Sequence, residues 1–82
     1  MQTVKWQWKS DQGWIDYPIE TTIFLEESYI SQKTNVKIDE ERFVDFTQML
    51  QKRIDDPLKV RPIARKGPSI TKQNQQIFGH LF

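Results

Sequence analysis

Few side chains in this 82-residue chain could carry out catalytic chemistry, since it has one histidine and no cysteine. A serine or cysteine triad needs a histidine base beside its nucleophile, and a zinc site needs several nitrogen or sulfur ligands. The single histidine, His80, lies in a polar C-terminal segment, where we expect it to be solvated. We therefore predict no catalytic residues, no metal site and no cofactor.

Two clusters of carboxylates, Asp39–Glu41 and Asp55–Asp56, are the remaining candidates for acid–base chemistry. Both fall in segments with turn character, where acidic side chains bond to nearby backbone groups and face water. The three glycines are isolated, so no glycine-rich loop is present to hold a phosphate. These observations indicate that the domain itself is not an enzyme.

All three tryptophans lie between Trp6 and Trp14, and they either build a core or present a surface. Trp6 and Trp8 alternate with Lys5, Gln7 and Lys9, which is the pattern of a half-buried strand. Tryptophan is highly buried on average, so we expect Trp6 and Trp8 in the core. Trp14 follows a turn and is expected either under a helix or at the rim of a site.

Composition and charge restrict the type of protein. A chain of this length forms one domain, and a hydrophobic fraction of 37% predicts a thin core. The net charge of +1 gives little support for nucleic-acid or membrane binding, and no apolar run is long enough to span a membrane. The absence of cysteine fits an intracellular setting, cytoplasmic or nuclear. We expect the chain to be part of a larger protein.

Turn residues and alternating apolar residues predict strands on both sides of a single helix. The order indicates an α+β domain in which the helix crosses one face of a bent antiparallel sheet. The turns are expected at 10–13, 39–41 and 55–58. The predicted strands are Thr3–Lys9, Trp14–Tyr17, Asn35–Ile38, Arg42–Phe46, Gln48–Arg53 and Lys59–Arg65; Val44, Phe46 and Met49 are predicted in the core.

The helix is predicted over Thr21–Gln32, with Thr21 or Thr22 as its N-cap. Residues at three- and four-residue spacing predict its buried face, namely Ile19, Ile23, Tyr29 and Ile30 with Phe24 or Leu25.

We assign residues 1–66 to the domain and 67–82 to a tail or a linker to a following domain. The tail opens with Gly67-Pro68 and continues with polar, glutamine-rich residues. It either acts as a linker or packs its apolar residues on a neighbouring domain. Those residues are Ile77, Phe78, Leu81 and Phe82.

Five segments in this order, WQW, GWIDY, FLEESY, VDFTQMLQKR and VRPIARK, resemble the WWE domain family. The family is named after two tryptophans and a glutamate, which correspond here to Trp6, Trp14 and Glu26. The resemblance covers about Val4 to Lys66. It implies a half-barrel of about six antiparallel strands with one α-helix packed across it.

The resemblance also implies a function. WWE domains occur in ubiquitin ligases, including the Deltex type, and in the poly(ADP-ribose) polymerase superfamily. Several bind ADP-ribose or the iso-ADP-ribose unit of poly(ADP-ribose). By position in the family motifs, Trp14 matches the ring that stacks on the nucleotide, Gln51 a glutamine that hydrogen-bonds the ligand, and Arg61 an arginine that contacts the diphosphate. The implied partners are ADP-ribose or poly(ADP-ribose)-modified proteins and other domains of the parent chain.

Two further positions of the implied site depart from the strongest poly(ADP-ribose) readers, since Gln7 and Arg42 stand where those have tyrosines. We expect weak binding and a preference for a terminal ADP-ribose or a free nucleotide. The alternative is a protein-interaction or scaffolding module whose ADP-ribose pocket is degenerate. RNA binding is disfavoured by the low net charge. For the parent protein, an ADP-ribosyltransferase is favoured over a ubiquitin ligase.

Overall fold

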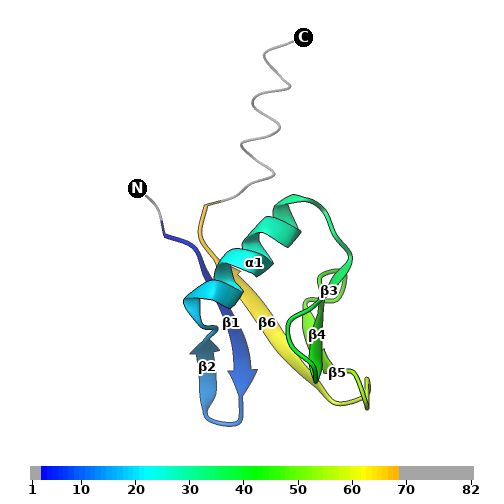
Figure 1. The fold of residues 1–82 in the computed structure, drawn as a ribbon. Helices are drawn as coiled ribbons and strands as arrows, with labels where there is room; N and C mark the ends of the chain where they lie inside the picture. The colour runs from blue at the N-terminus through cyan, green and yellow to red at the C-terminus, as the bar shows by residue number, and fades with distance from the viewer. Residues whose placement is uncertain (1–2, 69–82) are drawn as a thin grey trace.

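The computed structural model describes residues 3–68, which form six antiparallel strands and one helix (Figure 1). The strands follow one another across the sheet in the order β2-β1-β6-β5-β4-β3, so β2 and β3 are its open edges. The predicted α+β half-barrel is therefore confirmed. The strands are β1 (Lys5–Ser10), β2 (Gly13–Asp16), β3 (Asn35–Lys37), β4 (Arg42–Asp45), β5 (Leu50–Arg53) and β6 (Val60–Lys66).

The β1–β2 hairpin forms because its turn satisfies its own polar groups. The Ser10 hydroxyl donates to the Gly13 carbonyl oxygen at 2.7 Å and accepts from the Gln12 backbone N–H at 3.1 Å. Gly13 has a φ of 134°, a conformation that glycine adopts without steric cost. On its other side β1 pairs with β6, with Trp6 opposite Arg65 and Trp8 opposite Ile63. This pairing joins the first and last strands of the domain.

The predicted strand Gln48–Arg53 begins only at Leu50, because a turn occupies the preceding residues. The Asp45 carboxylate accepts hydrogen bonds from the backbone N–H groups of Thr47 and Gln48, at 2.9 and 3.2 Å. Met49 then adopts a positive φ of 55°. An aspartate that bonds to the backbone two residues later favours such a turn. The other predicted strand ends agree with the observed ones to within two residues.

The helix α1 spans Ile19–Ile30 and begins two residues before the predicted start at Thr21. Its N-cap is Pro18, so the prediction of Thr21 or Thr22 as the cap is wrong. Proline lacks an N–H and has a fixed φ, which suits the start of a helix. Thr22 lies inside the first turn, where its hydroxyl donates to the Tyr17 carbonyl oxygen at 3.3 Å.

The predicted buried face of α1 is also largely wrong. Leu25 and Ser28 face the sheet and are buried, whereas Ile19 and Ile23 are exposed. Ser28 is small, and its hydroxyl donates to the Phe24 carbonyl oxygen at 2.8 Å, so it can approach the sheet without an unpaired polar group. The helix is therefore rotated away from the face with most isoleucines.

The core lies between α1 and the inner face of the sheet, and Trp6 is at its centre with no solvent exposure. The rings of Tyr29 and Phe46 meet the Trp6 ring edge-on, with centroids 5.3 and 5.6 Å away. The predicted burial of Trp6, Val44 and Phe46 is confirmed, while Trp8 and Met49 are only partly buried against the core. The buried apolar residues are Trp6, Tyr17, Leu25, Val36, Val44, Phe46 and Ile63.

A hydrogen-bond network fixes the rotation of α1 on the sheet. The Glu26 carboxylate accepts from the Trp6 indole N–H at 2.9 Å and from two guanidinium nitrogens of Arg65 at 2.9 and 2.7 Å. Turning the helix to bury Ile19 and Ile23 would break these bonds and leave a charge with little solvent. The network therefore explains why the helix presents its less apolar face to the core.

The structure describes only Gly67 and Pro68 of the predicted tail. Residues 69–82, which include His80 and the apolar residues of the tail, lie outside the described part. The assignment of 67–82 to a tail or linker stays a prediction. In residues 3–68, α1 is neither long nor apolar enough to cross a membrane.

Candidate ligand-binding site

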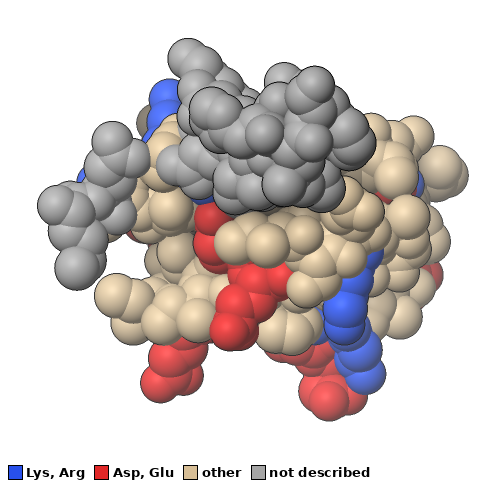
Figure 2. All heavy atoms as spheres, turned by 90° about the horizontal axis from the view of Figure 1, so that it is seen from above, with Lys and Arg blue, Asp and Glu red and all other residues tan. Residues whose placement is uncertain are grey.

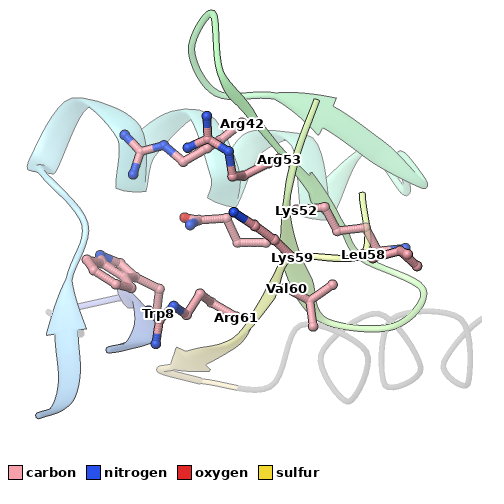
Figure 3. Close-up of a pocket in the computed structure, with 9 residues that line it drawn as sticks. Trp8, Arg42, Lys52, Arg53, Leu58, Lys59, Val60 and Arg61 are labelled. Atoms are coloured by element: carbon pink, nitrogen blue, oxygen red, sulfur yellow. The ribbon is translucent and has the colours of Figure 1, made fainter. Parts of the chain in front are cut away.

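A cavity of about 540 Å³ is lined by residues of β1, β4, β5 and β6 and of the turn between β5 and β6. Its volume lies within the range of small-molecule sites, roughly 300–1,000 Å³. Trp8 and Arg61 lie on one side of it, and Arg42 and Arg53 on the other (Figure 3). The lining residues are Trp8, Arg42, Gln51, Lys52, Arg53, Leu58, Lys59, Val60 and Arg61.

Strand pairing places the polar floor of the cavity. Gln51 of β5 lies directly opposite Arg61 of β6, so their side chains share one face of the sheet. Val44 of β4 lies opposite Gln51 on the other side and is fully buried, which identifies this as the inner face. Gln51 and Arg61, both site residues implied by the family resemblance, are thus brought together.

The Gln51 amide is held in one orientation by Tyr17. The buried Tyr17 hydroxyl donates to the Gln51 Oε1 atom at 2.6 Å, and burial raises the pKa of this phenol. Tyr17 therefore remains a hydrogen-bond donor across the physiological pH range. Every fully buried side-chain nitrogen or oxygen atom of the described part has a hydrogen-bond partner. The Gln51 Nε2 atom has no partner among the described protein groups, so it is not one of these fully buried atoms. This amino group therefore offers its hydrogens to the cavity.

Five of the nine lining residues are basic, which makes the cavity suitable for an anion. Four of the five already pair with carboxylates, most closely Arg42 with Asp39 and Arg61 with Asp11, both at 2.7 Å. The other pairs are Lys52 with Asp45 at 3.3 Å and Arg53 with Asp55 at 2.9 Å and with Glu41 at 3.8 Å. Within residues 3–68, Lys59 has no carboxylate at ion-pairing distance.

These ion pairs keep both partners charged near neutral pH. The hydrogen bond from Arg61 holds the pKa of Asp11 below its usual value, and the hydrogen bond from Arg42 does the same for Asp39. Both acids are partly or largely exposed, so the pairs are screened by water and individually weak. A multiply charged phosphate ligand can compete with such carboxylates for the guanidinium groups.

Two predicted site residues, Gln7 and Trp14, lie outside the cavity lining. Gln7 donates to the Asp16 carboxylate at 2.7 Å, and Trp14 pairs across the hairpin with Lys9. Neighbours across paired strands point to the same side, and the Lys9 ammonium lies 5.7 Å from the centre of the Trp14 ring. Both residues thus belong to the outer face of β1 and β2, opposite Trp8. Their part in ligand binding stays a prediction.

Sequence reasoning missed Trp8 and three basic residues of the lining, and also Tyr17, which orients Gln51. Part of the signal for Trp8 was present, since residues two apart on a strand share a face, which puts Trp8 on the same side of β1 as Trp6. The basic residues Lys52, Arg53 and Lys59 flank the turn at 55–58, so their meeting was also readable from the hairpin.

The assembled site combines an aromatic face, an oriented amide donor and several cations, which suits a ligand with a nucleobase and phosphates. In residues 3–68 no group of three or more histidine, cysteine, aspartate or glutamate side chains could hold a metal ion. Among protein families, the one described as WWE domain matches residues 4–65. A search of curated proteins finds no match to this chain.

Proposed function

The chain belongs to the WWE domain family, whose domains are non-catalytic, and from that premise we propose that it binds ADP-ribose or a unit of poly(ADP-ribose). Binding of these ligands is known for the family in general. The observation that carries the proposal is the cavity in which Trp8, Gln51 and Arg61 meet. These three residues supply stacking, directional hydrogen bonding and charge at one place.

Each lining residue has a role that its chemistry supports. The half-buried Trp8 ring offers a face on which adenine stacks. The Gln51 amino group, oriented by Tyr17, donates to a ribose hydroxyl or a base acceptor. Arg61 and Lys59 bind the diphosphate, and Lys59 does so without first leaving a carboxylate. The proposal gives Trp8 the stacking role that family resemblance assigns to Trp14.

Ion pairs inside the free protein set the expected strength of binding. A diphosphate must replace Asp11 on Arg61 and Asp39 on Arg42, or bind beside them with part of the charge already neutralised. In either case each new contact with the ligand contributes less binding free energy than it would with an unpaired arginine. We therefore expect weak binding that weakens further as salt is added.

Arg42 determines which ligand form fits. It lies on the far side of the cavity from Trp8, where it can contact a phosphate at the free end of a ligand (Figure 3). A tyrosine hydroxyl at this position would instead be able to bond a ribose within a chain. With Arg42 present, we propose a preference for terminal ADP-ribose or a free nucleotide over the internal iso-ADP-ribose unit.

The biological setting follows from the family rather than from the cavity. We propose that the domain belongs to a larger protein of the ADP-ribosylation or ubiquitin pathway and recruits ADP-ribosylated partners. An ADP-ribosyltransferase parent is favoured over a ubiquitin ligase. An intracellular location, in the cytoplasm or the nucleus, accords with these ligands.

A second candidate, a protein-interaction module with a degenerate pocket, is favoured by one observation. Four of the five cations in the cavity are already paired with carboxylates of the same chain. If these pairs are stronger than any phosphate contact, the cavity stays closed to nucleotides and the domain acts through its surface.

An NMR titration of the full chain with ADP-ribose, ATP and iso-ADP-ribose separates the two candidates. We expect shifts of the Trp8 indole and the Gln51 side-chain amide, with larger shifts for ADP-ribose than for iso-ADP-ribose. The buried Trp6 indole is the internal control and should move little. If none of the three ligands shifts Trp8, Gln51 or Arg61 at millimolar concentration, the binding proposal fails and the interaction module replaces it.

A further inference from the structure

The outer side of α1 carries an apolar stripe for which the ligand cavity has no use. Ile19, Ile23 and Ile30 are 76%, 55% and 51% exposed. Their spacing of four and seven residues places them on one side of the helix, away from the buried Leu25. A row of exposed isoleucines on a helix is unusual for a surface that faces only water. We refer to these three residues as the isoleucine stripe.

A shallow groove of about 370 Å³ runs beside this stripe, between α1 and the residues that precede β1. Val4, Ile19 and Ile23 give it an apolar floor, and Glu26 and Glu27 lie at its edge. Seen from above, the surface outside the grey atoms is mostly uncharged, with acidic side chains at its centre and lower edge and basic ones toward the sides (Figure 2). Such a groove fits an apolar segment with little negative charge.

The described chain ends close to Val4, one of the residues that line this groove. A Cβ atom at Gly67 would lie 3.0 Å from the Val4 Cγ2 atom and 3.4 Å from its Cα atom, so the two segments are in close contact. The Arg65 guanidinium donates to the Pro68 carbonyl oxygen and fixes the chain direction there. Val4 therefore touches both the groove and the point from which residues 69–82 continue.

The sequence beyond Pro68 has the composition of a tether followed by an apolar anchor. Residues 69–76, SITKQNQQ, are mostly polar, and Ile77, Phe78, Leu81 and Phe82 follow them. Eight residues lie between Pro68 and Ile77, and these nine residue steps span at most about 30 Å. The helix is roughly 18 Å long at 1.5 Å per residue, so the anchor can reach any part of the isoleucine stripe.

We propose that residues 77–82 dock on the isoleucine stripe of their own chain. Docking would remove the apolar side chains of this segment and of the stripe from water, and the three isoleucines of the stripe are largely exposed in the described domain. A short tether gives an effective concentration in the millimolar range, which favours the segment over a second copy of the chain at lower concentration. The proposal is independent of the ligand-binding site.

Because the chain has no cysteine, one introduced cysteine can carry a spin label at a single chosen position, which makes a direct test possible. A nitroxide attached to a Gln76→Cys variant of the full, 15N-labelled chain lies next to the proposed anchor. We expect it to broaden the amide signals of Ile19, Ile23 and Ile30. Signals of β5, from Leu50 to Arg53, serve as the internal reference and should keep their intensity.

A matched variant tests whether the anchor causes the effect. Adding Phe78→Ser and Leu81→Ser to the spin-labelled chain should restore the amide signals of α1. Equal broadening in both variants would show that the tether alone brings the label near, which would overturn the proposal. So would a full-length labelled chain whose α1 signals are never broadened.

A mixed sample distinguishes the two possible occupants of the stripe. Cysteine-free 15N-labelled chain is combined with unlabelled chain that carries the nitroxide. Unchanged α1 signals are expected if the segment binds its own domain. Broadening of Ile23 in this mixture would mean that a second copy occupies the stripe, and the proposal would be wrong.

Discussion

Two halves of the same sheet face carry similar residues and differ in what covers them. In the covered half, Trp6 and Arg65 lie opposite each other on β1 and β6, and both bond to Glu26 of α1. The Arg65 and Glu26 side chains are only 11% and 17% exposed. Here the tryptophan and its charged neighbours hold the helix on the sheet.

In the open half, Trp8 lies two residues after Trp6 on β1, and Arg61 lies four residues before Arg65 on β6. Arg61 also has a carboxylate partner, Asp11, but these side chains are 42% and 84% exposed. The same residue types thus form a structural network where α1 covers them and an accessible site where it does not. The position of α1 over the sheet decides which of these residues are covered and which stay accessible.

The largest expected effect comes from Trp6. Trp6→Ala should lower the free energy of unfolding by about 3–5 kcal/mol, because it empties the centre of the core and removes a bond to Glu26. Trp8→Ala should cost about 1 kcal/mol, since its ring is already half exposed. Urea denaturation of the two variants measures both. Equal losses would contradict the distinction between the covered and the open half.

Glu26 provides a test of the covered half through pH. The hydrogen bond from Arg65 is the main cause that lowers the pKa of Glu26 below its usual value. The stabilising effect is therefore complete above the unfolded-state pKa and is lost as the pH falls through the folded-state value. Glu26→Gln should cost about 1.5–3 kcal/mol at pH 7, and the difference from the unmodified chain should shrink below about pH 4.5.

Asp11→Asn is the matched control in the open half. Its carboxylate also bonds to an arginine, but in full contact with water, so we expect no measurable change of stability at pH 7. Both variants are followed by thermal and urea unfolding at pH 7 and pH 3. A pH-independent cost of Glu26→Gln would mean that the carboxylate charge plays no part in holding the helix.

Much of the fold was predictable because strand alternation and turn residues are local signals. The rotation of α1 was not, since its most apolar side faces outward. What overrides that pattern is the bonding of Glu26 to Trp6 and Arg65, residues 20 and 39 positions away. The sequence of the helix alone does not reveal such distant partners, so the spacing of the isoleucines predicted the wrong buried face for α1.

The candidate site was predictable to the extent that it lies on one hairpin. Gln51 and Arg61 meet because their strands are joined by a turn, and strand register brings them to one face. Which tryptophan lines the cavity depends on where α1 lies over the sheet, which is not a local property. The sequence therefore did not show that Trp8 lines the cavity, and the role of Trp14 in binding stays a prediction.

Arg61 should dominate the affinity of the open half. Arg61→Ala is expected to weaken ADP-ribose binding by about 1.5–3 kcal/mol, on the order of a 10- to 100-fold rise in Kd, because a charged hydrogen bond to phosphate is lost. Lys9→Ala, on the outer face, is the control and should leave Kd unchanged. Calorimetry at two salt concentrations measures both, and the effect of Arg61 should be larger at low salt.

The smallest effects, those of single aromatic rings on affinity, give the sharpest test of which tryptophan faces the ligand. Trp8→Ala should cost about 1–3 kcal/mol of binding through lost stacking, with folding retained. Trp14→Ala should leave Kd unchanged if its ring stays 45% exposed beside Lys9 on the outer face. Calorimetric titration of each variant with ADP-ribose decides between them, after NMR spectra have shown that both are folded. The reverse result would assign the ligand to the outer face of the β1–β2 hairpin, where Gln7 also lies. The cavity would then have no part in binding, and the covered and open halves of the inner face would differ in packing alone.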